Sequence, residues 1–224
     1  MSQFAVSPAT ATDLPAIAKI VQNAFEDSPN TISYWMLPRE NEAAVYEWRL
    51  RRAEENFHND PTSSFIKCVD TATDKIVAFA IWEKPYSFMT QEQKAKQQQD
   101  GREMRSNDND LPKGTNAALL HDLDAQTARM RAKYVNREED YVLRALATLP
   151  QYQGKGCGSA LLQWSLEKVD ADGRRVFLEA TPQGHSLYAK FGWKDVDEMV
   201  FDLNAFGFNG HVQKIICMMR DATK

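Results

Sequence analysis

The hydrophobic residues near the start of the chain predict one short strand followed by two amphipathic helices. The strand covers residues 4–8. In the first helix the apolar residues recur at the i, i+3, i+4 and i+7 spacing of one buried face: Leu14, Ile17, Ala18, Val21, Ala24 and Phe25. A second helix is predicted over about residues 40–57, where Val45, Trp48 and Phe57 would face inward and many charged residues would face water.

Two apolar runs in the middle of the chain predict a β-hairpin, and a long polar stretch follows it. The runs cover residues 64–69 and 75–82, and turn-forming residues join them. From about residue 85 to residue 136 the composition is too polar for a core of its own, which indicates a partly helical insertion. Its helix is predicted over about residues 116–135, where four apolar residues are helically spaced: Leu119, Leu123, Met130 and Tyr134.

The last third of the chain alternates strands and helices, as α/β proteins do. A strand over residues 141–149, a helix over about 156–169 and a strand over 175–180 predict a parallel strand pair with a helical crossover. A short helix over about 183–190 and strands near 193–203 and 211–219 complete the order. Since no clear linker divides these 224 residues, we expect a single α/β domain over residues 1–224.

Charge, cysteine and histidine content exclude several classes of function. The formal net charge of −4 gives no overall field for binding nucleic acid. The start of the chain lacks a basic segment followed by an apolar one, and no stretch approaches the roughly 20 apolar residues of a membrane span. The cysteines are far apart and the histidines lack metal-ligand spacing, so we expect neither disulfides nor a metal site. These features predict a soluble, cytoplasmic protein without a nucleic-acid or membrane partner.

A glycine-rich turn after the strand at 141–149 is the strongest functional signal. Gly154, Gly156 and Gly158 allow the backbone to turn and to approach a ligand closely. The N–H groups of the first helical turn, together with the helix dipole, form a binding site for an anion such as a pyrophosphate. The turn therefore predicts a phosphate-bearing ligand.

Two common phosphate-binding motifs do not fit this turn. The Walker loop requires Gly-x-x-x-x-Gly-Lys-Ser/Thr, but here Leu149 takes the place of the first glycine and Gly156 that of the hydroxyl residue. The dinucleotide fingerprint Gly-x-Gly-x-x-Gly has a different spacing from the evenly spaced glycines found here. A nucleotide-binding module is a minor alternative, which stabilisation by ATP or NAD and not by coenzyme A would support.

Two segments resemble the Gcn5-related N-acetyltransferase (GNAT) superfamily. Residues 153–158, Gln-Gly-Lys-Gly-Cys-Gly, are similar to the family's Q/R-x-x-G-x-G/A motif, which many members place after a Leu-Ala-x-x-Pro strand end. Residues 187–193, Leu-Tyr-Ala-Lys-Phe-Gly-Trp, look like its L-Y-x-x-x-G-F/W segment. The resemblance is specific over about residues 141–193, and before that it depends on element order alone.

This resemblance implies a GNAT-like α/β fold, with a mixed, mostly antiparallel sheet of about seven strands flanked by helices. The strand ending at Leu149 and the strand ending at Ala180 would splay apart and hold acetyl-CoA. The residues implied to bind it are Leu146, Ala147, Thr148, Gln153, Gly154, Lys155, Gly156, Cys157, Gly158 and Ser159. The implied activity is transfer of an acetyl group to an amine of a small molecule or peptide by direct attack. Whether the protein is a homodimer is left open.

Acetyl transfer needs a neutral amine, an oxyanion contact and a proton for the departing thiolate. The resemblance implies that Tyr188 is the general acid, because its ordinary pKa of about 10 suits a thiolate, although a packed helix tyrosine is the alternative. A backbone N–H near Thr148 would bind the oxyanion. Glu83 and Glu179 are the candidate general bases, each with a structural ion pair as its alternative role.

The strand at 141–149 departs from the family pattern. If its side chains alternate strictly, Asp140, Val142 and Arg144 share one face with Leu146 and Thr148. Some family members carry a glutamate or histidine on this face, whereas this chain carries Val142 and Arg144, and we expect Arg144 to form an internal ion pair. A non-catalytic acyl-CoA-binding module, which kept the cradle and lost the base, is therefore the alternative function.

Cys157 and the loop at 28–36 complete the candidates. A thiol at a helix N-terminus can ionise readily, but no histidine lies near Cys157 in sequence, so we expect no acyl-cysteine intermediate. We expect the loop at 28–36 and parts of the insertion to line the acceptor side of the site, with Tyr34 and Trp35 packed in the core.

Overall fold

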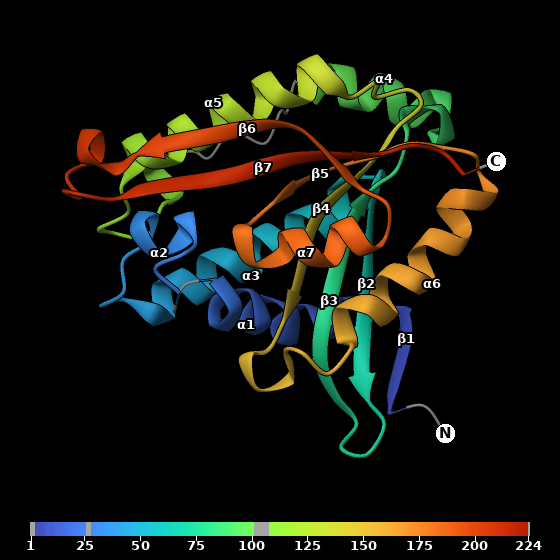
Figure 1. Cartoon of the computed structure of the whole chain (residues 1–224), viewed down its shortest axis with the longest axis horizontal. Helices are drawn as coiled ribbons and strands as arrows, with labels where there is room; N and C mark the ends of the chain where they lie inside the picture. The colour runs from blue at the N-terminus through green and yellow to red at the C-terminus, as the bar shows by residue number, and fades with distance from the viewer. Residues whose placement is uncertain (1–2, 26–27, 101–107, 224) are drawn as a thin grey trace.

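The computed structural model describes residues 3–25, 28–100 and 108–223, with the backbone alone for residues 96–100. Seven strands form one sheet in the order β1-β2-β3-β4-β5-β7-β6 (Figure 1). The strands are β1 (Phe4–Pro8), β2 (Ser63–Asp70), β3 (Lys75–Glu83), β4 (Tyr141–Thr148), β5 (Val176–Ala180), β6 (Lys194–Asp202) and β7 (Val212–Arg220). The α-helices are α1 (Leu14–Phe25), α2 (Ile32–Met36), α3 (Glu42–Asn59), α4 (Gln91–Asp100), α5 (Ala117–Tyr134), α6 (Cys157–Ala171) and α7 (Pro182–Lys190).

The sheet is mixed and mostly antiparallel. β4 and β5 are parallel neighbours, and every other neighbouring pair is antiparallel. α6 connects β4 to β5, because two parallel strands need a crossover between them. The predicted fold class, a seven-stranded mixed sheet flanked by helices, is confirmed.

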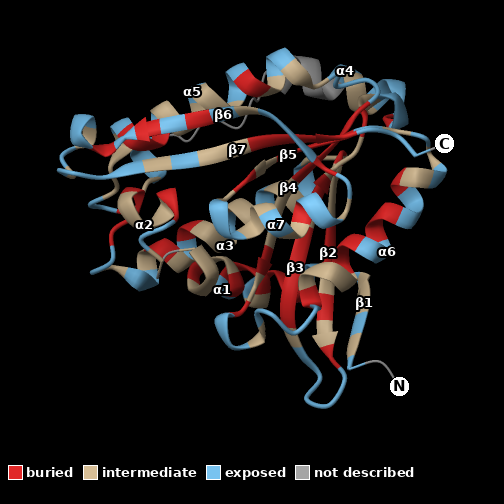
Figure 2. Ribbon diagram, in the orientation of Figure 1, coloured by how far each residue is buried: buried red, intermediate tan, exposed pale blue. Residues whose placement is uncertain are grey.

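Helices cover both faces of the sheet, and the buried residues lie mainly along the strands and on the helix faces that meet them (Figure 2). On one face, Leu161 and Leu162 of α6 cluster with residues of β2 to β5. On the opposite face, Ile17 of α1 clusters with Phe79 of β3. α5 packs on that same face beyond β4, where the Tyr134 ring stacks on Phe177 of β5 with centroids 6.3 Å apart. Helices therefore shield both faces of the sheet.

The predicted elements start and end within two residues of the observed ones. The structure adds two helices that the hydrophobic pattern did not predict, α2 within the loop at 28–36 and α4 in the polar stretch. Ile20 of α1 is buried although it lies outside the predicted stripe. The helix predicted at 116–135 is present as α5 and packs on the sheet through Leu119 and Met130, while residues 101–107 of the predicted insertion lie outside the described residues.

A β-bulge in β4 overturns the predicted alternation of its side chains. Ile81 of β3 pairs with Ala145 and the next residue, Trp82, pairs with Leu143, so Arg144 is an extra residue in β4. Leu143 and Leu146 both join the cluster beneath α6, although they are three positions apart and strict alternation would put them on opposite faces. Because one inserted residue reverses which face the following side chains occupy, Val142 does not share a face with Leu146.

β4 and β5 separate after a short paired stretch. The pairing runs from Tyr141 with Val176 to Leu143 with Leu178. Beyond it, β5 continues on β7 and β4 continues on β3, but no pairing joins β4 to β5 among the described residues. The predicted splay between these strands is therefore present, and it begins at the bulge.

Candidate functional site

The open edge of β4 presents backbone groups to the gap. The Leu149 N–H donates to the Val77 carbonyl of β3 over 2.9 Å, so the backbone of Leu149 points toward β3. Backbone direction alternates along a strand, which turns Ala147 toward β3 and turns Leu146 and Thr148 toward the gap. Of the three strand residues predicted to bind a cofactor, two thus offer hydrogen-bonding groups there, while Ala147 is buried in the core with Phe79.

The glycine turn has the backbone conformation that requires glycine. Gly154 and Gly156 have φ angles of +73° and +94°, in the left-handed region that other residues rarely adopt. No atom lies within 4 Å of a Cβ built on either residue, so the space beside the turn is open. Gly156 is the N-cap of α6, and no side chain of the described residues caps this helix. The first-turn N–H groups of α6, from Cys157 onward, are therefore directed at this open space.

The side chains around the turn support the cradle. Gln153 donates from Nε2 to the Thr148 carbonyl oxygen over 3.2 Å and so ties the turn to the end of β4. Lys155 is exposed, with Nζ 5.1 Å from the centroid of the Tyr152 ring. Cys157 is buried, and this burial raises the pKa of its thiol. The thiol is therefore neutral, which suits a side chain packed in the interior. Its expected lack of a nucleophilic role agrees with this environment.

Gly158 joins the two segments that resembled the same family. A Cβ on Gly158 would lie 2.9 Å from Leu187 Cδ2 of α7 and 3.5 Å from Leu146 Cδ2 of β4. Any side chain larger than hydrogen would push these leucines apart. The glycine turn, the splayed strand and α7 therefore pack closely at one point, and Tyr188 follows Leu187 directly.

Tyr188 lies near the end of α7 in a nearly closed environment. It is 8% exposed, and its ring packs edge-on against Trp193 with centroids 5.9 Å apart. Burial raises the pKa of Tyr188 well above its usual value near 10. The expectation of an ordinary tyrosine acid is thereby corrected, because the same burial disfavours the tyrosinate. The hydroxyl remains protonated at physiological pH and is suited to donate a hydrogen bond.

A cavity of about 330 Å³ opens between the splayed strands and the helices α1, α2 and α3. Leu146 of β4, Glu179 of β5 and Tyr188 of α7 contribute to its lining. The opposite side comes from α1, the segment 30–33, α3 and β7. The gap in the sheet, the buried tyrosine and one carboxylate thus meet around one enclosed space.

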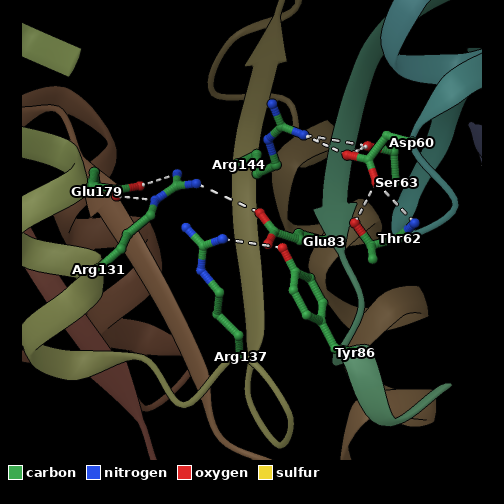
Figure 3. A network of polar contacts seen from close by, with 9 residues as sticks. All are labelled: Asp60, Thr62, Ser63, Glu83, Tyr86, Arg131, Arg137, Arg144 and Glu179. Carbon is green, nitrogen blue, oxygen red and sulfur yellow. Dashed lines mark hydrogen bonds and ion pairs between the residues drawn. The ribbon is translucent and has the colours of Figure 1, made fainter. Parts of the chain in front are cut away.

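Arg131 of α5 holds both candidate bases (Figure 3). Its Nε and Nη2 donate to the two carboxylate oxygens of Glu179 over 2.7 and 2.9 Å. Its Nη1 lies 3.6 Å from Glu83 Oε2. Although burial lowers the pKa of Arg131, the charge and hydrogen bonds of Glu179 outweigh this and raise it. The structural ion pair, the alternative role for each glutamate, is therefore present, and Glu179 lines the cavity while Glu83 does not.

Two further polar residues of β4 and its flank have structural partners. Arg144 contacts Asp60 Oδ2 at 3.2 Å, which is the internal ion pair expected from the sequence (Figure 3). Asp140 accepts from Arg175 over 3.0 and 2.7 Å, and its side chain is 3% exposed. Asp140 lies outside the cavity lining, so it does not reach the site as a base.

The acceptor side differs in part from the prediction. The segment 30–33 lines the cavity as expected, but none of the described residues of the predicted insertion does. Trp35 is half-buried and packs against Phe208 at the edge of a core cluster, with ring centroids 5.2 Å apart. Tyr34 is also half-buried, so the expectation that both residues lie in the core is met only in part. Sequence reasoning missed the residues of α3 and β7 that line the cavity: Arg49, Arg52, Ala53, Asn56, Gln213, Lys214 and Ile215. No motif marks them, since tertiary packing alone brings these elements to β4.

The described residues contain no group of three or more histidine, cysteine, aspartate or glutamate side chains that could hold a metal ion. In the same parts of the chain, none of the helices combines the length and apolar character that crossing a membrane needs.

Residues 119–195 match the family model of the acetyltransferase (GNAT) domain. This range runs from α5 through β4, the glycine turn, α6 and β5 to α7, and so contains the splay, the cradle and Tyr188. A search of curated proteins finds no match.

Solved structures with this fold align over nearly the whole chain. One, from Corynebacterium glutamicum, is described as histone acetyltransferase HPA2 and related acetyltransferase; it has a TM-score of 0.61 at 19% identity and covers 100% of this chain and 98% of its own. The PaiA N-acetyltransferase from Thermoplasma acidophilum, in complex with coenzyme A, has a TM-score of 0.52 at 15% identity and covers 99% of each chain. A phosphinothricin acetyltransferase from Sinorhizobium meliloti, in complex with acetyl-CoA, has a TM-score of 0.55 at 15% identity and covers 99% and 89%.

Proposed function

We propose that this chain, a GNAT superfamily member by its fold and by the family match over residues 119–195, is an acetyl-CoA-dependent N-acetyltransferase. One observation carries the proposal: the strand gap and the buried Tyr188 adjoin one cavity, and the glycine cradle packs directly beside them. We further propose that residues 1–224 act as one acyl-CoA N-acyltransferase domain.

The residues of the cradle fit the donor substrate. A pyrophosphate would bind the first-turn N–H groups of α6 beside Gly154 and Gly156, where the backbone is open and the helix dipole favours an anion. The pantetheine arm carries amide groups, which match the backbone groups that Leu146 and Thr148 turn toward the gap. Two of the compared structures hold coenzyme A or acetyl-CoA, which supports this donor.

The chemistry would take place inside the cavity. The amine nitrogen attacks the thioester carbonyl carbon, and the backbone N–H groups at the gap stabilise the oxyanion that forms. As the carbon–sulfur bond breaks, Tyr188 donates a hydrogen bond to the developing thiolate and then its proton. Because burial raises the pKa of Tyr188, this proton transfer is favourable only if the departing thiolate is equally shielded from water.

The general base is the part of the mechanism that the structure changes most. Glu179 is the carboxylate at the cavity, and we propose that it accepts the amine proton through water. Glu83 lies outside the lining and helps to hold Arg131, so we propose a positioning role for it. Arg131 donates to both oxygens of Glu179, so a proton on this carboxylate would replace one of these hydrogen bonds, and a substrate that arrives as a neutral amine is the favourable case.

The ion pairs that Arg131 forms with Glu83 and Glu179 also favour the second candidate function. A non-catalytic acyl-CoA-binding module would keep the cradle and the splay, and it would leave Glu83 and Glu179 in their ion pairs with Arg131. Both functions predict binding of coenzyme A, so binding alone does not separate them.

Turnover separates the two functions. The purified protein is saturated with acetyl-CoA and given a broad panel of amines, and free thiol and the mass of each amine are measured. An N-acetyltransferase releases thiol only with an acceptor and adds one acetyl group to it. Binding of acetyl-CoA without amine-dependent thiol release would overturn the proposed N-acetyltransferase activity and support the acyl-CoA-binding module. Stabilisation by ATP or NAD and not by coenzyme A would overturn both.

A further inference from the structure

One wall of the cavity is strongly basic. Arg49 and Arg52 of α3 line it together with Arg144 from the bulge of β4, and Lys214 of β7 adds a fourth cationic side chain. Glu179 is the one carboxylate among the described residues of the lining, and an arginine already binds both of its oxygens. Arg144 is paired with Asp60 and Lys214 with Glu198, so the basic character of this wall depends on Arg49 and Arg52 of α3.

Protein contacts fix the guanidinium groups of this wall. Arg49 and Arg52 both lie over the Trp48 ring, each with its guanidinium carbon 5.1 Å from the ring centroid. Stacking uses the flat face of a guanidinium, while its five N–H donors point outward in the plane. Such a group can keep its structural partners and bind an oxyanion at the same time.

The charges on the wall repel one another. Burial lowers the pKa of Arg52; Asp124 partly offsets this, and the charge of Arg49 adds to the lowering. Like charges that are partly removed from water cost free energy, and an anion placed among them reduces that cost. The wall is thus better suited to an anionic ligand than to a neutral or cationic one.

Asn56, one turn beyond Arg52 on α3, adds a hydrogen-bond acceptor. Its residue lines the same cavity, and its side-chain oxygen Oδ1 is buried without a hydrogen-bond partner among the described residues. A buried amide oxygen is stabilised when an N–H or O–H group donates to it. The wall therefore combines donors for an oxyanion with an acceptor for a ligand N–H or O–H group.

We propose that the acceptor is a small amine that also carries an oxyanion, either a carboxylate or a phosphate, and that Arg49 and Arg52 bind this oxyanion. The assignment rests on the proposed N-acetyltransferase function. A cavity of about 330 Å³ suits a small molecule held inside it. With the oxyanion on α3, the amine faces Leu146 and Tyr188 on the other side of the same cavity.

Matched acceptor pairs test the assignment. We would measure kcat/KM for 4-aminobutyrate against 4-aminobutanamide and for 3-aminopropyl phosphate against 3-aminopropanol, with amino acids and arylalkylamines paired in the same way. The anionic member of each productive pair is expected to be favoured by about 10- to 100-fold, the worth of a charged hydrogen bond. The two series distinguish carboxylate from phosphate.

Variants on one helix supply the controls. Arg52→Gln and Arg49→Gln are expected to lower kcat/KM for the anionic member far more than for the neutral member and so to remove most of the preference, while Arg52→Lys retains part of it. Arg51→Gln is the matched control, because Arg51 is exposed on the same helix and donates to the Asp110 carbonyl outside the cavity. Thermal melting and acetyl-CoA affinity of each variant verify that the fold and the donor site are intact.

Each outcome decides one proposal. Turnover without an anionic preference, or a preference that survives in both Arg49→Gln and Arg52→Gln, overturns the acceptor assignment and leaves the enzyme standing. If no amine is turned over although acetyl-CoA binds, both the proposed N-acetyltransferase activity and the acceptor assignment are overturned.

Discussion

At the scale of single residues, burial decides the chemistry more than residue type does. Tyr188 and Glu179 carry the functional groups that acetyl transfer needs, yet the surroundings change both. Removal from water makes the tyrosine hydroxyl a weaker acid than an exposed one, and Arg131 occupies both oxygens of the glutamate. At the residue scale, the proposed acid is therefore a hydroxyl that stays protonated, and the proposed base is a carboxylate that already accepts two hydrogen bonds.

The first prediction concerns the Tyr188 hydroxyl. Tyr188→Phe keeps the ring that packs on Trp193 and removes the proton donor, so kcat is expected to fall by about 100-fold or more while acetyl-CoA affinity stays unchanged. Steady-state thiol release and calorimetric binding check the two parts. Tyr134→Phe is the control, since its hydroxyl donates to the Val196 carbonyl away from the cavity. A Tyr188→Phe enzyme as fast as the wild type would rule out the acid role.

At the scale of elements, the candidate site lies where irregular parts of β4 and α6 meet α7. β4 gains an extra residue at Arg144, α6 begins at the glycine turn, and α7 presses Leu187 against Gly158. The splay beyond the bulge and the glycine turn direct backbone groups at the gap and at the open space beside α6. With acetyl-CoA bound there as proposed, main-chain groups supply most of its contacts, and side-chain substitutions report on them poorly.

Glycine substitutions test this element directly. Gly156→Ala and Gly173→Ala each place a Cβ at a positive φ, +94° and +64°, where no atom lies within 4 Å. Both are expected to destabilise the fold by about 1–2 kcal/mol, because left-handed backbone disfavours a side chain. Only Gly156→Ala, at the cradle end of α6, is expected to weaken acetyl-CoA binding, by about tenfold or more through a distorted phosphate contact.

Melting temperature and acetyl-CoA affinity, measured for both glycine variants, separate strain from ligand contact. If Gly173→Ala, at the far end of α6, weakened acetyl-CoA binding as much as Gly156→Ala does, strain of the helix would explain the loss and the cradle would not be the phosphate site.

At the scale of the whole molecule, free cysteines buried in the sheet couple stability to pH. Burial raises the pKa of Cys68 and of Cys217 to about 12, from 9.0 for an unhindered thiol. In the unfolded chain both thiols ionise near their ordinary pKa, while in the folded protein they stay protonated. Their contribution to stability is therefore complete below about pH 9 and is lost as the pH rises toward 12.

The third prediction is an alkaline decline of the free energy of unfolding. Each such thiol is expected to contribute a slope of about 1.4 kcal/mol per pH unit above pH 9. Cys217→Ala lowers stability at neutral pH through the lost packing but removes the slope of one thiol. Urea unfolding between pH 7.5 and 10 measures both quantities. Equal pH dependence in the wild type and in Cys217→Ala would show that this thiol does not ionise on unfolding as described.

The order of the elements and the place of the glycine turn could be predicted from local sequence patterns, and the mixed sheet from the family resemblance. Hydrophobic spacing and glycine are local signals, since they express how one short segment meets water or turns its backbone. Local signals do not predict α2 or the burial of Ile20, because both depend on the elements that pack against them. The cytoplasmic location and the oligomeric state, which neither local signals nor the fold test, stay predictions.

The residues that line the cavity follow from the tertiary structure. The bulge at Arg144 cannot be found by assuming alternation, because one extra residue in β4 is visible only against its partner β3. Arg131 contacts Glu83 and Glu179, each 48 positions away in the sequence, and the arginines of α3 come from farther still to the lining of the cavity. The glycine turn and the helix start are thus encoded locally, because each depends on one short segment. The lining of the cavity depends on long-range packing, which brings side chains of α3, β4 and β7 together.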